Sequence, residues 1–196
     1  MKITDYVILF LFIILSFISV YNIKDNMAFQ SIIHNEEMNR IIDNTTVYAF
    51  EKGYTENNND KELINNQIVV ETFISRLCQL LWGVDSEENK DELWDRILCM
   101  FIINEDGYYL CDKEGIGDKI LFENIIHESK VYEIENVIEK CIREYDYNVY
   151  LPKNYGEKNS QTISDNSFLV VYRTQITSYF GEDYAECIIS GAAIKS

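Results

Sequence analysis

The strongest constraint in this sequence is a run of eighteen uncharged residues near its start, YVILFLFIILSFISVYNI, from Tyr6 to Ile23. As an α-helix this run would span about 27 Å, close to the thickness of the hydrocarbon layer of a bilayer. A cleaved signal peptide has a more basic start, a shorter apolar run and a small-x-small cleavage site, whereas this run ends in VYNI. We therefore expect an uncleaved membrane helix, with a transmembrane anchor at residues 1–25. The alternative is a buried hydrophobic helix of a soluble protein.

The net charge limits the partners of the chain. Its 17 basic and 33 acidic side chains give a formal charge of −16, which repels nucleic acid and disfavours anionic lipid headgroups. Membrane contact must then come from apolar burial. Lys2 and Lys24 flank the two ends of the run almost symmetrically, but the residues that follow are mainly acidic. This pattern favours a single-pass protein of the cell membrane with its amino terminus inside and its bulk outside.

The next segment predicts a helical stalk at residues 26–55. Apolar side chains follow helical spacing at Phe29, Ile32 and Ile33, and again from Ile41 onward, with the polar stretch HNEEMNR between the two groups. Because no Pro interrupts the pattern, the membrane helix and the stalk can form one rod of about 50 residues, roughly 75 Å long. We expect Gly53 to end it.

The remaining residues, 56–196, predict an α+β globular head. The pattern indicates helices at 63–82, capped by Asn59 or Asp60, and at 129–145, and a hairpin in which CMFIIN and YYLCD flank a turn whose Asp106-Gly107 pair takes positive φ. A strand at 148–151 and a three-strand meander, SFLVVYRT, QITSYF and YAECIISGAAI, complete a small antiparallel sheet. The stretches DSEENKDE and KEGIGDK are expected to be loops, and the long helix is expected to pack on one sheet face.

No motif defines a reaction, a cofactor or a metal. His34 and His127 have no nucleophile partner, and the acidic pairs Glu36/Glu37, Glu87/Glu88 and Glu182/Asp183 are better read as solvated side chains. Residues 57–62 carry oxygen donors without the glycine and final Glu of an EF-hand loop, which leaves only a weak calcium site as the alternative to a plain connector. The single GxG lacks the context of a phosphate-binding loop. We therefore expect a protein that is not an enzyme.

The five cysteines lie in apolar or amphipathic runs, and buried free thiols are the simplest interpretation. A Cys99–Cys111 disulfide across the hairpin is the alternative, if the head lies outside the cell. Four aromatic side chains, Trp82, Trp94, Tyr108 and Tyr109, could line a ligand or partner surface between the hairpin and the helices, although core packing would explain them equally well.

The unit DYVILFLFIILSFISVYNI followed by NRIIDNTTVYAFEKG resembles the amino-terminal part of pilin-like proteins, especially the minor pseudopilins of tight-adherence (Tad-type) pili. The likeness is architectural and covers roughly residues 1–55. It implies a structural or assembly component of an envelope pilus or secretion apparatus, whose partners are the membrane and other membrane or pilus proteins, including copies of itself. The order of helices, hairpin, helix and meander is also similar to PAS-like and Cache extracellular sensor domains, which implies instead a membrane-tethered domain that binds a small ligand near Tyr108 and Tyr109.

Overall fold

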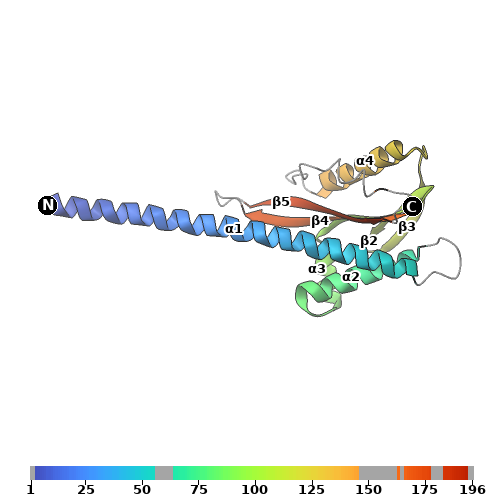
Figure 1. The fold of residues 1–196 in the computed structure, drawn as a ribbon, viewed down its shortest axis with the longest axis horizontal. Coiled ribbons are helices and arrows are strands. Elements are labelled where there is room, and N and C mark those ends of the chain that lie inside the picture. Colours follow the sequence, from blue (N-terminus) through green and yellow to red (C-terminus); the bar gives the residue numbers. More distant parts are fainter. Residues whose placement is uncertain (1–2, 56–63, 146–162, 164–165, 178–182, 194–196) are drawn as a thin grey trace.

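Three layers make up the head in the computed structural model, and one very long helix projects from it (Figure 1). The structure describes residues 3–55, 64–145, 163, 166–177 and 183–193, with side chains except at 3–9, 11, 28, 55, 144–145, 175–177 and 183–184. A five-stranded antiparallel sheet forms the middle layer, with α1 and α2 on one face and α4 on the other. The predicted α+β class is confirmed.

The described helices and strands follow one another as α1 (Ile3–Thr55), α2 (Asn66–Trp82), α3 (Glu87–Trp94), β1 (Ile97–Ile103), β2 (Gly107–Asp112), β3 (Gly115–Leu121), α4 (His127–Tyr145), β4 (Ser167–Thr177) and β5 (Asp183–Ala193). Across the sheet the strands lie in the order β3-β2-β1-β4-β5. Among the residues described, no helix is both long enough and apolar enough to cross a membrane.

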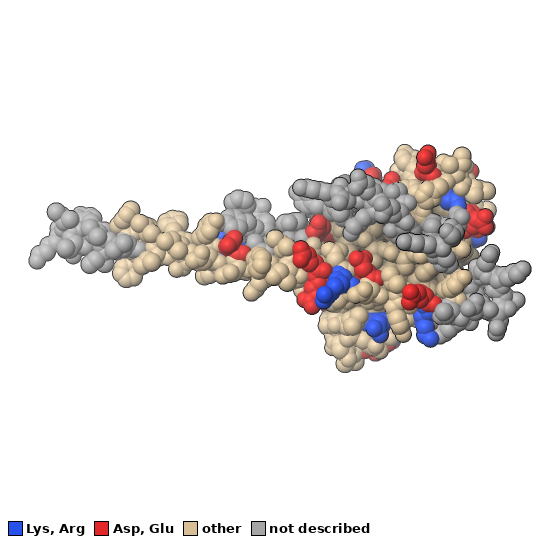
Figure 2. Space-filling model, in the orientation of Figure 1, with Lys and Arg blue, Asp and Glu red and all other residues tan. Residues whose placement is uncertain are grey.

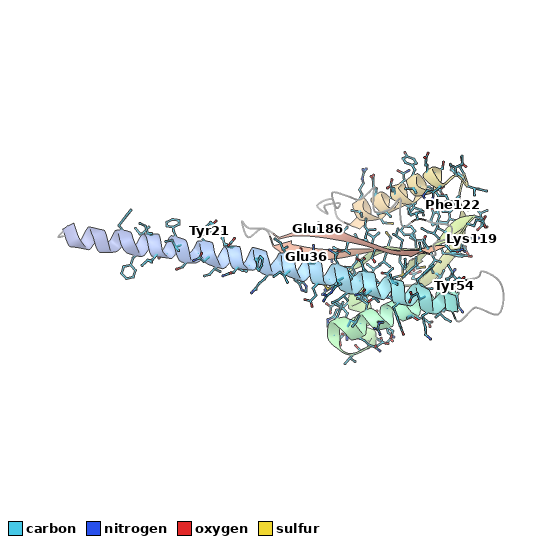
Figure 3. All side chains as sticks on the ribbon, in the orientation of Figure 1. Tyr21, Glu36, Tyr54, Lys119, Phe122 and Glu186 are labelled. Carbon is cyan, nitrogen blue, oxygen red and sulfur yellow. The ribbon has the colours of Figure 1, made fainter. Side chains whose placement is uncertain are left out.

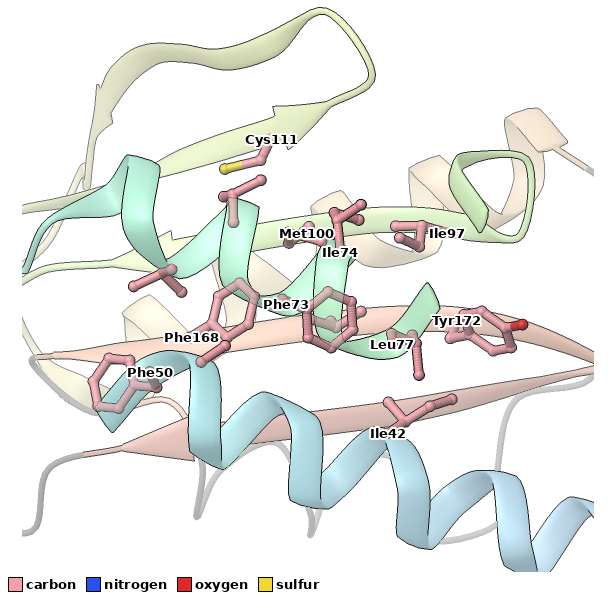
Figure 4. Close-up of a cluster of buried hydrophobic side chains, with 14 of the residues drawn as sticks. Ile42, Phe50, Phe73, Ile74, Leu77, Ile97, Met100, Cys111, Phe168 and Tyr172 are labelled. Carbon is pink, nitrogen blue, oxygen red and sulfur yellow. The ribbon is translucent and has the colours of Figure 1, made fainter. Parts of the chain in front are cut away.

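The long rod predicted from the sequence is confirmed, since α1 is continuous over 53 residues. Its second half packs against β4 and β5, and against α2. The fully buried Ile42 faces the cluster formed by Phe73, Leu77 and Phe168 (Figure 4). The expected packing of the long helix on one sheet face is therefore confirmed.

Gly53 does not end α1, which continues to Thr55. It lies instead at a close contact between α1 and the start of α2: a Cβ atom at Gly53 would stand 2.3 Å from Val69 Cγ2 and 3.1 Å from the backbone oxygen of Asn65. The helix crossing therefore requires a residue without a side chain. The end of α2 is of another kind, because Gly83 caps it in the left-handed conformation at φ 75°.

β1 lies at the centre of the sheet because its sequence, ILCMFII, is apolar at every position. It pairs with β2 on one side and β4 on the other, so residues of alternating register supply the cores of both faces. Phe101 packs against Tyr108 on the α4 side, whereas Met100 belongs to the core under α1 and α2. The hairpin is confirmed, but Gly107 does not take the expected positive φ. A Cβ atom there would stand 2.2 Å from the backbone oxygen of Ile120, so Gly107 permits the close pairing of β2 with β3.

Two predicted loops are regular structure. DSEENKDE contains the start of α3, where the Ser86 side chain caps the helix by accepting from the Asn89 N–H, and Glu87 and Glu88 fill the first turn. KEGIGDK forms most of the edge strand β3, and the turn before it is made by Asp112, whose Oδ1 accepts from the backbone N–H of Gly115. Gly115 takes a φ of 132°, which favours glycine.

The three-strand meander is wrong. SFLVVYRT and the start of QITSYF belong to one strand, β4, which continues to Thr177 and pairs with β5 along its whole length. β1 pairs with β4 only as far as Tyr172, so the polar residues Arg173 and Thr174 lie where β4 has β5 alone as its partner. The predicted strand at 148–151 and the connector at 57–62 lie outside the described residues. The predicted cap at Asn59 or Asp60 is wrong, because α2 begins at Asn66 and its N-cap is Asn65, whose Oδ1 accepts from the Ile68 N–H at 3.2 Å.

Candidate functional site: the projecting half of helix α1

The first half of α1 extends away from the head, and its described side chains lie in the open. The apolar ones are all exposed, from Phe10 and Phe12 to Ile32 and Ile33, and Phe17 reaches 73%. Four consecutive residues, Phe12 to Leu15, are among them, so every side of the helix is apolar. Figure 2 shows this part almost without charged side chains, in contrast to the head. A helix that is apolar all round is normally covered by a protein core or by lipid.

The two hydroxyl groups inside the apolar run are satisfied within the helix itself. Ser16 Oγ donates to the Phe12 carbonyl and Ser19 Oγ donates to the Leu15 carbonyl, both at 2.8 Å. Neither hydroxyl needs water as a partner. The cost of placing these serines in an apolar environment is therefore reduced.

The apolar stripe of α1 changes sides where the helix leaves the head. At about 100° per residue, Phe29, Ile32 and Ile33 lie roughly 160° around the helix from the side of Met38 and Ile42. Met38 and Ile42 are buried in the head, whereas Phe29, Ile32 and Ile33 are 63%, 52% and 47% exposed. We call Phe29, Ile32 and Ile33 the outer stripe. It faces away from the side that packs on the sheet, so the head cannot cover it.

Two polar contacts fix the point where α1 reaches the head, close to Glu36 and Glu186 in Figure 3. Asn35 Nδ2 donates to Glu186 Oε2 at 2.9 Å, and Ser190 Oγ donates to Thr46 Oγ1 at 3.0 Å. Both join α1 to β5, and the second is fully buried. The direction in which the projecting half leaves is therefore set by contacts with an edge strand of the sheet.

The structure does not bring the four predicted aromatic residues together. Tyr108 is buried on the α4 face, between Phe101 and Phe122. Its neighbour Tyr109 points to the opposite face and packs, like Trp82 and Trp94, at the border of the core under α1 and α2. The Arg96 guanidinium also lies over the Trp82 ring, 5.7 Å from its centroid.

Trp94 lines an open groove. The groove has a volume of about 680 Å³ and lies between α1, α2 and α3. Charges of both signs line it: Asp85 accepts from Ser75 and pairs with Lys90 at 3.3 Å, and the Arg76 guanidinium lies 4.4 Å from the centroid of the Tyr48 ring. The hydrogen bond from Ser75, together with Lys90, lowers the pKa of Asp85.

The remaining candidates are dispersed. His34 and His127 are exposed, on α1 and at the start of α4, and Glu36 and Glu37 are exposed on α1. All five cysteines are free. Cys111 belongs to the core under α1 and α2 and Cys99 to the core under α4, so the two thiols lie on opposite faces of the sheet, and the alternative of a Cys99–Cys111 disulfide is excluded. Burial raises the pKa of the Cys78 thiol to about 11.

Sequence reasoning missed one surface, at the end of the head farthest from the start of α1. Ile120, Leu121, Ile125 and Ile126 are exposed there. The signal was present in the letters KILFENII, which hold five apolar residues in eight, of which only Phe122 is buried. It was overlooked because the segment was expected to be a turn.

The comparisons with known proteins add no relative. No protein-family model matches the chain, and searches of curated proteins and of solved structures find no significant match.

Proposed function

We propose that this protein is a non-enzymatic single-pass membrane protein, a structural or assembly component of an envelope pilus or secretion apparatus. In this proposal residues 1–25 anchor the chain and the acidic head lies outside the cytoplasm. The observation that carries it is the division of α1. One continuous helix contributes its second half to the core and presents its first half as an apolar surface on all sides.

Lipid is the cover that best fits the first part of this surface. Soluble monomers rarely expose apolar patches larger than a few hundred Å², and here large apolar side chains are exposed from Phe10 through Ile23. The eighteen-residue run in the sequence has no charge, and the hydroxyls of Ser16 and Ser19 donate to backbone carbonyls. A formal charge of −16 gives no electrostatic attraction to anionic headgroups, so burial of apolar side chains would supply the affinity.

The outer stripe supports the assembly part of the proposal. Phe29, Ile32 and Ile33 follow the charged pair Lys24 and Asp25, so an anchor ending near residue 25 leaves them outside the hydrocarbon layer. Since they face away from the head, a helix from a second copy or from another single-span protein can pack against them without displacing the sheet. Beyond the stripe, the same side of α1 continues with the exposed Glu36 and Arg40, which suit charge pairing between neighbouring helices.

Photo-crosslinking in intact cells tests this proposal. The photoreactive residue p-benzoylphenylalanine replaces Ile33, which is 47% exposed, in one variant and Val84, a residue of the head that is 59% exposed, in the control. We expect irradiation to trap the Ile33 variant with itself or with other single-span proteins, and to leave the Val84 variant largely monomeric. Only monomer from the Ile33 variant would contradict the assembly role.

A membrane-tethered ligand-sensing domain is the second candidate, and the groove beside Trp94 favours it. A volume of about 680 Å³ is within the range of small-molecule sites. Thermal unfolding of the detergent-solubilised protein with metabolite pools would reveal a ligand as a rise in melting temperature. We expect an Arg76→Ala variant to lose that rise if the groove binds the ligand. A flat response to every pool would remove this candidate.

A further inference from the structure

The exposed end of the head formed by the end of β3 and the start of α4 differs from the rest of its surface. Four apolar side chains follow closely in sequence and are all exposed: Ile120 at 43%, Leu121 at 64%, Ile125 at 67% and Ile126 at 62%. Tyr132, on the next turns of α4, is 67% exposed. We call these five residues the tip patch. Lys119 and Phe122, labelled beside it in Figure 3, lie at the end of the molecule opposite the start of α1.

Among the residues that the structure describes, the charged side chains next to the tip patch that remain available are acidic. A groove of about 540 Å³ next to it is lined by Glu123, Glu128 and Glu133, together with Tyr132 and three uncharged polar residues. The two nearby lysines are engaged: Lys119 pairs with Asp106 at 2.5 Å, and Lys130 is 2% exposed with its ammonium 5.5 Å from the centroid of the Phe122 ring. The rim of the patch therefore has a negative potential that its own lysines do not neutralise.

The backbone at this site also favours contact with another chain. β3 is an edge strand, paired with β2 alone. Its one lysine, Lys119, is held by Asp106, so the strand lacks the free lysine that often protects an edge. Gly115 and Gly117 add no side chain to the strand.

We propose that the tip patch binds a basic, amphipathic segment of a partner protein. Apolar side chains of that segment cover Leu121, Ile125 and Ile126, and its lysines or arginines pair with Glu123, Glu128 and Glu133. Charge complementarity identifies this partner, because an acidic rim around an apolar centre attracts cations and repels acidic segments. This inference is independent of the proposed membrane anchor, since it concerns the opposite end of the molecule.

Binding of two synthetic peptides to the full chain in lipid nanodiscs tests the inference. One fluorescent peptide alternates leucine and lysine, and the other alternates leucine and glutamate. We expect the lysine peptide to bind, with an affinity that falls as salt rises, and the glutamate peptide to bind at least about tenfold more weakly. Absence of binding by the lysine peptide, or equal binding of both peptides, would overturn the inference.

Paired variants locate the binding. The double variant Ile125→Ser/Ile126→Ser should lose at least about tenfold in affinity, and Glu128→Gln/Glu133→Gln should flatten the salt dependence. The matched control Leu80→Ser/Val84→Ser removes two apolar side chains that are 48% and 59% exposed elsewhere on the head, and should bind as the unaltered chain does. Equal loss in the control, or none in the tip variants, would refute the assignment. As a second measurement on the unaltered chain, a photoreactive leucine in the lysine peptide should form adducts within residues 120–136, and adducts confined to other segments would refute it too.

Discussion

The second half of α1 should be indispensable for folding of the head, whereas the projecting half should not. Two fragments separate these roles: residues 35–196 keep the part of α1 that packs on the sheet, and residues 56–196 lack α1 altogether. Met38, Ile42 and Phe50 are 5%, 0% and 4% exposed. At about 1.5–3 kcal/mol for each buried side chain of this size, the shorter fragment loses roughly 5–9 kcal/mol. Because the whole stability of a domain is about 5–15 kcal/mol, we expect that loss to abolish cooperative folding.

Urea unfolding followed by circular dichroism measures the difference. Fragment 35–196 should unfold in one cooperative transition, and fragment 56–196 should show none. Single substitutions check the reasoning within the longer fragment: Ile42→Ala should cost about 2–5 kcal/mol, whereas Val47→Ala, at a position 42% exposed on the same helix, should change stability by less than about 0.5 kcal/mol. Equal urea midpoints for the two fragments would refute the assignment of α1 to the core.

Three further predictions concern the head. Gly53→Ala should destabilise fragment 35–196 by about 1–2 kcal/mol, as the added methyl meets Val69, and a second substitution, Val69→Ala, should recover part of that loss in the same urea assay. In a thiol-reagent assay of the native protein, the half-buried Cys141 should react first and the four buried thiols only after denaturant is added. Ser75→Ala should raise the pKa of Asp85 towards its ordinary value in an NMR titration. Because the folded-state pKa of Asp85 is lowered, the hydrogen bond from Ser75 stabilises the fold above about pH 4, and this stabilisation disappears as the pH falls through the folded-state pKa. The difference in stability between variant and parent should therefore vanish in acid.

The parts of the fold that follow a strict period were predictable from the sequence. α1, α2 and α4 each bury a stripe at helical spacing, and β1 reads as a continuous apolar run because both its faces are covered. The errors concern strand segments that pair with a neighbouring strand on one side only. The sequence of β3 predicts a turn because an edge strand does not need an apolar face, and the sequence of β4 predicts two strands although β5 pairs with it throughout.

The candidate site was predictable only in part. The apolar run and the side chains of the outer stripe can be read from the sequence, but which side of α1 faces the head depends on the packing of Ile42 against the sheet. The aromatic set failed to assemble for a related reason. Tyr108 and Tyr109 are adjacent in a strand, so they point to opposite faces, and the sequence alone does not say which face is covered by which helix.

Membrane fractionation of the untagged, full-length chain tests the central claim most directly. We expect it in the membrane fraction, resistant to alkaline carbonate and released by detergent, while fragment 35–196 remains in the soluble extract. A Phe12→Lys/Phe17→Lys variant should leave the membrane fraction, because each lysine in the middle of a spanning helix costs about 2.5–3.5 kcal/mol. Recovery of the unaltered full-length chain in the soluble extract without detergent would contradict the account.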